Sequence, residues 1–344
     1  MIERAIQVKR QYLDYLLSKP NVVACGVGYK ETGGVITGQP AVIVSVERKV
    51  PTAQLAPQDM VPRTLEEVKT DVVEVGKIKA WQPILPVDSG PRDKWRPAPG
   101  GVSIGHVDIT AGTLGCLVTR GGLSRPSGHG ELFILSNNHV LANTNRAHLG
   151  DPIIQPGRYD GGTPADEIGL LEAFIPIHFG TEETTCPIAR TMEKALNLAA
   201  QWVGSSHRVV GYKVAPAENQ VDAAIARPLS AGLVERQILE IGLPQGAHEA
   251  TLGTRVQKSG RTTGHTWGTI RQIDVTVGVD YYGRMATFTD QVMAGAMSGG
   301  GDSGSAVLDE EGYVVGLLFA GSDLTTVISP IQLVLDALGI QIAT

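Results

Sequence analysis

Apolar positions recur at helical spacing near the start of the chain and at strand spacing further on. Over residues 2–18 they predict an amphipathic helix that ends before Pro20. The side chains on its apolar side are Ile2, Ile6, Leu13 and Leu17. Strand-like runs follow at residues 22–29, 41–46 and 71–75, with a turn at Gly33-Gly34. We therefore expect residues 1–82 to form a small α+β domain.

A change of pattern marks the second part of the chain. Residues 83–100 are rich in Pro and Gly and lack apolar periodicity, which predicts a linker. After it, short apolar runs separated by turn residues occupy positions 112–118, 132–135, 223–226, 255–258, 313–319 and 326–328. Such runs are typical of a mainly β domain, here residues 101–344. Two helices interrupt it, an alanine-rich one at 187–203 and a short one at 331–339.

Composition and charge narrow the class of protein. Gly accounts for 42 of 344 residues and aromatics for only 5%, which favours short strands and turns over long helices. The net charge of −6 disfavours a general nucleic-acid surface, and the longest apolar run, residues 312–321, is too short to span a membrane. The first twenty residues lack the apolar core of a secretory signal. Three cysteines without a Cys-x-x-Cys motif favour a cytoplasmic location.

Two segments carry residues suited to chemistry. In the first, the apolar run at 133–135 leads into a polar turn, Ser-Asn-Asn, and then His139. In the second, residues 298–305 read Ser-Gly-Gly-Gly-Asp-Ser-Gly-Ser, and an apolar run follows. A serine hydroxyl becomes a nucleophile only when a base removes its proton, and its product needs nearby N–H groups to receive an oxyanion. We predict Ser303 as nucleophile, His139 as base, and the N–H groups of Gly301 and Ser303 as oxyanion donors.

Together, SNNHV around His139 and GDSGS around Ser303 resemble the motifs of the chymotrypsin/trypsin-like serine peptidases. The resemblance covers roughly residues 100–344 and includes the chain order His, Asp, Ser. It implies a double β-barrel, preceded here by the small α+β domain. It also implies a serine endopeptidase that cleaves protein or peptide substrates through an acyl-enzyme, in an intracellular form without disulfides.

The resemblance requires an acid between His139 and Ser303. The aspartates in that interval that we considered are Asp151, Asp160, Asp166, Asp222, Asp274, Asp280 and Asp290. The family places its acid just before an apolar strand, and Asp222 is followed at once by the run 223–226. Asp222 is therefore the predicted acid, which orients His139, and Asp166 is the second choice.

The chain also departs from the family pattern. Met297, six residues before the nucleophile, replaces the acid that selects Lys or Arg in trypsin-like members, so we expect a different side-chain preference. The other predicted substrate-pocket residues are Phe319, Ala320 and Gly321. In the family, the Asp before the nucleophile can pair with a new N-terminus made by cleavage. No such activation motif is present here, so Asp302 needs another partner or is held by backbone donors. Lys258 and Arg261 are interpreted as a solvated turn.

Alternatives to a protease remain open at this point. The fold could serve as a catalytically silent module that binds peptides or partners, or as a protein that processes only its own linker. The remaining histidines show no metal-ligand spacing, and no cofactor is predicted. We expect no nucleic-acid or membrane partner. Strand edges of the N-terminal domain could pair between subunits in a homo-oligomer.

Overall fold

The computed structural model describes residues 1–80, 90–120, 131–202, 204–207, 209–214 and 218–344. Its N-terminal domain contains α1 (Ile2–Leu17), β1 (Val22–Thr32), β2 (Val35–Val46), β3 (Thr64–Leu65) and β4 (Val68–Glu74), with short 3₁₀ turns at Thr52–Gln54 and Pro57–Asp59. Gly33 and Gly34 form the β1–β2 turn with φ angles of 60° and 83°, where glycine is favoured. The predicted helix and strands of this domain are thus confirmed.

Helix α1 packs against the sheet through a narrow set of small and branched side chains. Ala5, Val8 and Leu16 are fully buried, and they meet Val27 of β1 and Val42 of β2. The side chains that the sequence places on the apolar side of the helix are only partly buried around this core.

The N-terminal domain continues directly into the sheet of the second domain. β1 pairs antiparallel with β18 (Gly264–Tyr281), and Ala24 lies opposite Val277. Beside this junction, the Lys9 ammonium lies 3.2 Å from the Asp274 carboxylate, and their side chains are only 3% and 8% exposed. The outer edge of this sheet is the two-residue strand β3. Formation of a homo-oligomer through the strand edges of this domain stays a prediction. The strand β1 is not a free edge, because it is already paired within the chain.

This buried ion pair gives a stability prediction. Asp274→Asn removes the charge but tolerates the left-handed φ of 49° at this position. Because Lys9 would be left buried without its counterion, we expect a loss of about 3 kcal/mol in the free energy of unfolding. Asp290→Asn is the matched control, since that carboxylate is 40% exposed and has one 3.4 Å contact to Arg10. Urea unfolding measures both, and equal losses would contradict the role given to Lys9.

Six strands of the second domain close into a barrel. They are β17 (Arg255–Gly260), β18, β19 (Arg284–Gly295), β20 (Ala306–Asp309), β21 (Val314–Gly321) and β22 (Thr325–Pro330). The order is β19–β22–β21–β20–β17–β18, and an additional β18–β19 pairing closes the ring. The short strand β14 (Glu218–Asn219) adds in parallel to β19. Alternate residues of β18, including Val275, Val277 and Val279, point into the barrel core.

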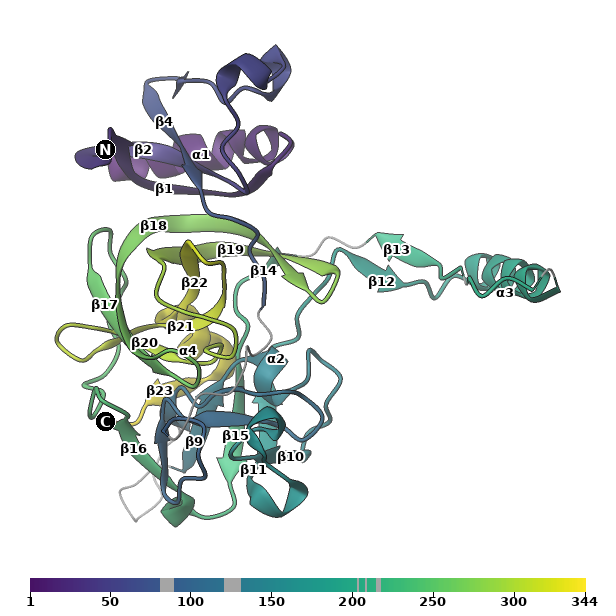
Figure 1. The fold of residues 1–344 in the computed structure, drawn as a ribbon, viewed down its shortest axis with the longest axis vertical. Coiled ribbons are helices and arrows are strands. Elements are labelled where there is room, and N and C mark those ends of the chain that lie inside the picture. The colour runs from purple at the N-terminus through teal and green to yellow at the C-terminus, as the bar shows by residue number, and fades with distance from the viewer. Residues whose placement is uncertain (81–89, 121–130, 203, 208, 215–217) are drawn as a thin grey trace.

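An eight-stranded sheet forms the other half of this region. Its order is β23–β8–β9–β15–β11–β10–β6–β7, and it wraps around a core that includes Ile104, Leu117 and Ile134. The bounds are β6 (Ser103–His106), β7 (Gly112–Thr113), β8 (Cys116–Arg120), β9 (Leu132–Ser136), β10 (Pro152–Ile154), β11 (Glu167–Phe174), β15 (Ala224–Pro228) and β23 (Ile340–Ile342). The helices α2 (Asn138–Leu141) and α4 (Ile331–Leu338) lie beside these sheets (Figure 1). Short 3₁₀ turns occur at Arg158–Asp160, Pro164–Asp166 and Ala231–Leu233.

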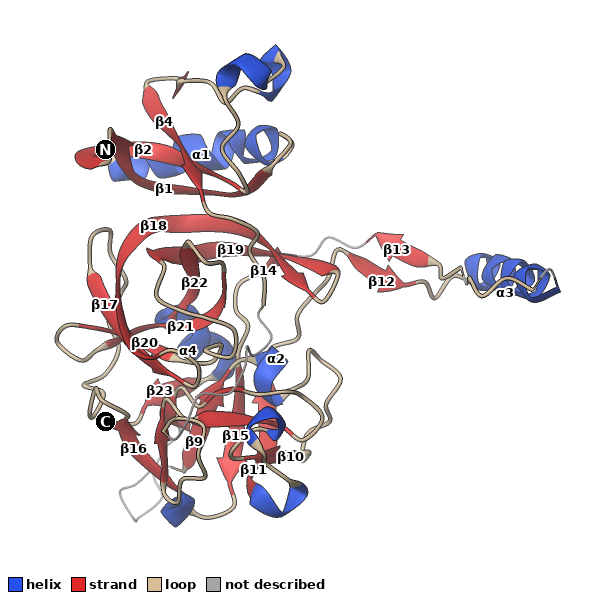
Figure 2. Ribbon diagram, in the orientation of Figure 1, coloured by secondary structure: helices blue, strands red, loops and turns tan. Residues whose placement is uncertain are grey.

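An arm projects from the molecule between the two halves. It consists of the hairpin β12 (Thr181–Glu183) and β13 (Tyr212–Val214) and the helix α3 (Pro187–Trp202). The predicted helix at this position is confirmed, although its last predicted residue, 203, lies outside the described residues. Figures 1 and 2 show α3 standing well away from both barrels. The long gap in sequence between His139 and Asp222 suggests that this helix is an insertion on the barrel rim, but the structure does not place it there.

The fold is mainly β and chymotrypsin-like, a double β-barrel preceded by a small α+β domain, as the sequence predicts. Residues 83–89 of the expected linker lie outside the described residues. At its other end, β5 (Ala98–Gly100) is buried and pairs with β16 (Val234–Ile238). The domain boundaries themselves stay a prediction. Among the described residues, no helix is long and apolar enough to cross a membrane.

Candidate active site

His139 and Asp222 lie together because two neighbouring strands place them there. β9 pairs antiparallel with β15, and Ser136 lies opposite Ala224. Just beyond this pair, β9 ends in the α2 turn that carries His139, and Asp222 stands just before β15. The Nδ1 atom of His139 is 2.5 Å from Oδ2 of Asp222, and the backbone N–H of His139 donates to Oδ1 over 3.2 Å.

The Asp222 carboxylate is held in a fully buried place. Its side chain is 0% exposed, and the phenol O–H of Tyr281 donates to Oδ2 over 2.7 Å. The Asn137 side chain fixes the backbone as well, because its Nδ2 donates to the carbonyl of Asp222 over 2.6 Å. Asp166, the second choice for the acid, instead pairs with Lys94 at 2.6 Å. That salt bridge, with hydrogen bonds from Thr163, strongly lowers the pKa of Asp166.

Ser303 lies on the loop before β20, and the other half of the molecule holds this loop. The N–H of Thr113 donates to the carbonyl of Ser303 over 2.8 Å, and its hydroxyl donates to the carbonyl of Gly301 over 2.9 Å. A Cβ on Gly112 would collide with Val140, the residue after His139, and would lie 3.0 Å from the Ser303 carbonyl oxygen. The segments that carry His139 and Ser303 therefore meet at Gly112.

The side chains of His139 and Ser303 share no hydrogen bond in the described structure. Nε2 of His139 is buried and has no hydrogen-bond partner among the described residues. The Ser303 hydroxyl is directed to the carbonyl of Phe319 over 3.4 Å.

Two glycines flank Ser303 in a left-handed backbone conformation. Gly301 has φ of 100° and Gly304 has φ of 95°, angles that favour glycine. Within the described chain, the N–H groups of Gly301 and Ser303 donate to no other group. Their role as oxyanion donors stays a prediction.

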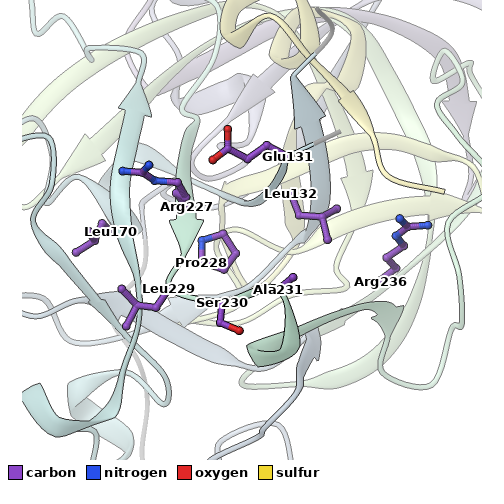
Figure 3. A pocket seen from close by; sticks show the side chains of 9 residues that line it. All are labelled: Glu131, Leu132, Leu170, Arg227, Pro228, Leu229, Ser230, Ala231 and Arg236. Atoms are coloured by element: carbon purple, nitrogen blue, oxygen red, sulfur yellow. The ribbon is translucent and has the colours of Figure 1, made fainter. Parts of the chain in front are cut away.

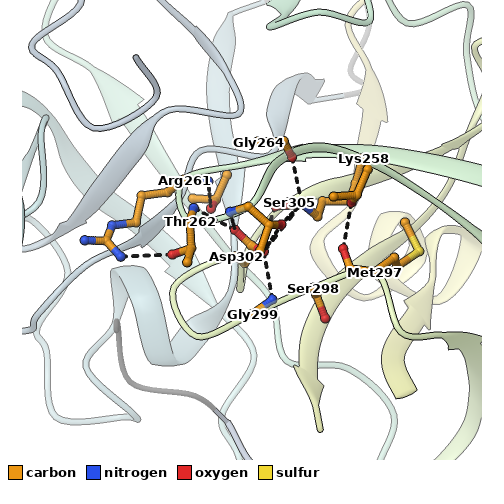
Figure 4. Close-up of polar contacts among 12 residues, drawn as sticks. Lys258, Arg261, Thr262, Gly264, Met297, Ser298, Gly299, Asp302 and Ser305 are labelled. Atoms are coloured by element: carbon orange, nitrogen blue, oxygen red, sulfur yellow. Dashed lines mark hydrogen bonds and ion pairs between the residues drawn. The ribbon is translucent and has the colours of Figure 1, made fainter. Parts of the chain in front are cut away.

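Asp302 finds its partner inside the chain. The ammonium of Lys258 lies 3.4 Å from Oδ2 of Asp302, and both side chains are 0% exposed (Figure 4). The carboxylate also accepts hydrogen bonds from the N–H groups of Thr262, Thr263 and Gly299 and from the Thr263 hydroxyl. Burial lowers the pKa of Lys258, and the negative charge of Asp302 opposes that shift. The ion pair between Asp302 and the buried Lys258 therefore holds the loop before Ser303 in place.

Lys258 and Arg261 do not form the solvated turn that the sequence suggests. Arg261 is 1% exposed, and its Nε donates to Asp160 over 2.6 Å. The backbone N–H of Arg261 also donates to the Thr113 hydroxyl over 3.0 Å. Each cation has a buried carboxylate partner, which is why burial is tolerated.

The predicted substrate-pocket residues are mostly packed into the barrel. Met297 is 4% exposed and its side chain lies against Gly268, whereas the Phe319 ring contacts Phe288 at a centroid distance of 4.7 Å. Ala320 is fully buried, and Gly321 lies in β21 close to Ser298. Their role in substrate binding stays a prediction.

A cavity of about 580 Å³ lies elsewhere, at the opposite end of β9 from His139 (Figure 3). Leu132, Arg227 and Pro228 contribute to its lining, and no predicted catalytic residue does. It is therefore separate from the candidate site.

Comparisons with known proteins give one family model and several solved structures that resemble parts of this chain. The family model described as the NARROW LEAF 1 N-terminal domain matches residues 4–75. The curated proteins contain no match. Among solved structures, Thermobifida fusca protease A is 20% identical with a TM-score of 0.44, and Cellulomonas bogoriensis chymotrypsin is 18% identical with a TM-score of 0.43. Each match covers 72% of this chain and 98% of the other. The fold assignment rests on the sheets described above, and these matches carry no argument about activity.

Sequence reasoning missed two residues that contact the site. Tyr281 alternates with Val277 and Val279 along β18. The sequence therefore indicates that all three lie on the same face of the strand, but it does not indicate which residue Tyr281 contacts. Lys258 ends the apolar run predicted at 255–258, and nothing in the sequence distinguishes it from a surface lysine. In the part of the chain that the structure describes, no group of three or more His, Cys, Asp or Glu residues could hold a metal.

Proposed function

We propose that this protein is a serine endopeptidase. The observation that carries the proposal is the 2.5 Å contact between Nδ1 of His139 and the buried Asp222, with Nε2 of His139 left unpaired and the His139 and Ser303 segments meeting at Gly112. Ser303 attacks the substrate carbonyl, and His139 takes the hydroxyl proton and returns it to the leaving amine. Asp222 keeps the imidazole oriented and stabilises its charged form. The N–H groups of Gly301 and Ser303 bind the oxyanion of the tetrahedral intermediate.

Substrate class and activation follow from the same residues. Met297 offers no carboxylate for a basic side chain, which supports a first-pocket preference other than Lys or Arg. Lys258 supplies a cation for Asp302 from within the chain, which supports activity without cleavage of the N-terminus.

The free cysteines Cys25, Cys116 and Cys186 fit the predicted cytoplasmic location. Burial raises the pKa of the Cys116 thiol to about 12, as expected of a core residue.

A fluorophosphonate probe tests the proposal directly. We expect the purified chain to be labelled covalently and Ser303→Ala to remain unlabelled, with Ser305→Ala as the matched control. Ser305 is buried two residues away and its hydroxyl only caps the carbonyl of Asp302 over 2.7 Å. A peptide library incubated with wild type and Ser303→Ala then reports the cleavage preference. An unlabelled, inactive wild type would overturn the proposal.

A silent or self-processing form of the same fold is the second candidate. The orientation of the Ser303 hydroxyl toward Phe319, rather than toward His139, is the observation that favours it. Wild-type protein mixed with the Ser303→Ala chain distinguishes these cases. Cleavage of the inactive chain only near residues 83–100 indicates self-processing, and binding of peptides without turnover indicates a silent module.

A further inference from the structure

Tyr281 contacts the candidate acid from a direction that the triad does not use. It is the last residue of β18, and its hydroxyl donates to Oδ2 of Asp222 over 2.7 Å. This is the same oxygen that lies 2.5 Å from Nδ1 of His139. One carboxylate oxygen is therefore held between an imidazole and a phenol.

The tyrosine itself is firmly positioned. Its side chain is 1% exposed, and β18 pairs with β19 so that Tyr281 lies opposite Arg284. The ring meets His139 and Phe179 edge-on, at centroid distances of 5.7 and 5.8 Å. The phenol therefore reaches Asp222 from a strand of the other barrel, and it has little freedom to turn away.

The phenol is suited to remain a donor at any working pH. Burial and the neighbouring charge of Asp222 raise the pKa of Tyr281 well above its usual value near 10. Tyr282 is 58% exposed, and partial burial together with the charge of Asp222 raises its pKa as well. In the described chain, Tyr281 and His139 are the residues whose side chains donate hydrogen bonds to the Asp222 carboxylate, and no other side chain does.

We propose that Tyr281 is a positioning residue that holds the Asp222 carboxylate against His139 and favours the proton-free form of this pair. The inference rests on the proposed peptidase function. His139 can act as base only when the Asp222–His139 pair has lost its proton and carries a net negative charge. A hydrogen bond donated to the carboxylate stabilises that charge in a site where Asp222 is 0% exposed.

Tyr281→Phe removes the donor and keeps the ring. Because the negative form of the pair loses a hydrogen bond, the pair binds its proton more tightly, and the acidic limb of the pH profile of kcat/KM moves up by about one pH unit. We expect kcat on the plateau to fall about tenfold because the imidazole is held less firmly. KM should change little, since the phenol does not face the substrate.

Tyr282→Phe is the matched control, because its side chain is 58% exposed and it donates no hydrogen bond to Asp222. This variant should keep the wild-type profile. A purely structural role for Tyr281 would lower activity or stability without moving the acidic limb, and that result would overturn the inference.

A second variant guards against misfolding of Tyr281→Phe. Ortho-fluorotyrosine at position 281 keeps the size of the side chain but has a more acidic, stronger-donating phenol, so the acidic limb should move in the opposite direction, to lower pH. An unmoved limb in this variant also overturns the inference. If wild type itself takes no fluorophosphonate label and cleaves no peptide, the proposed function fails instead, and the two failures are separable.

Discussion

His139→Ala and Ser303→Ala are each expected to lower kcat by about a million-fold, and the double variant no further. The base and the nucleophile act in one step, so removing either abolishes that step. The residual rate comes from the oxyanion donors and from substrate binding, which both variants keep. Asp222→Asn should cost less, about ten-thousand-fold, because the imidazole remains but loses its orienting charge. Single-turnover hydrolysis of an activated ester measures all four.

His248→Ala is the matched control for this series. Its Nδ1 also lies 3.0 Å from a carboxylate, that of Asp309, but its ring stacks on Tyr313 and is 44% exposed. It should retain wild-type turnover. If the effects of His139→Ala and Ser303→Ala instead multiplied in the double variant, the two residues would be acting independently, and the proposed triad would be wrong.

The predictable part of the fold consists of elements whose pattern is local. The turn at Gly33-Gly34 and the helix α3 follow from turn chemistry and helical spacing, and both are present. The long strands β18 and β19 fall outside the predicted runs, because bulges interrupt their alternation, as at Gln272–Val275. The pairing of β1 with β18 joins residues about 250 positions apart, which no local pattern encodes.

The candidate site, like the fold, has residues that the sequence predicts and residues that it does not. The placement of Asp222 beside His139 follows from a short motif and an adjacent apolar run, and the structure brings the two together. Lys258 and Tyr281 reach the site from other strands, so their partners depend on how the barrel closes. The sequence therefore predicts residues that react, and it leaves open residues that hold them in place.

The second prediction with a large expected effect concerns Lys258→Met. This substitution removes the cation that pairs with Asp302 in the loop before Ser303. Asp302 would remain buried with its charge and with only the Thr262, Thr263 and Gly299 donors. We expect a loss of about 3 kcal/mol in stability and a fall in kcat of about 10²- to 10³-fold, comparable to the loss of an oxyanion donor. The double variant Lys258→Met/Asp302→Asn should recover stability, because no charge is then left unpaired.

The pH dependence of the same pair separates charge from packing. Burial lowers the pKa of Lys258 below its usual 10.5, so the ammonium loses its proton, and the ion pair its charge, at a lower pH than for an exposed lysine. Wild-type activity should therefore fall on the alkaline side below pH 10.5. Lys258→Arg keeps its charge there, since a guanidinium does not deprotonate in this range, and it should shift the alkaline limb to higher pH. Profiles of kcat with the same ester measure the shift. An unchanged limb in Lys258→Arg would show that the loop is held by its backbone hydrogen bonds and not by the buried cation.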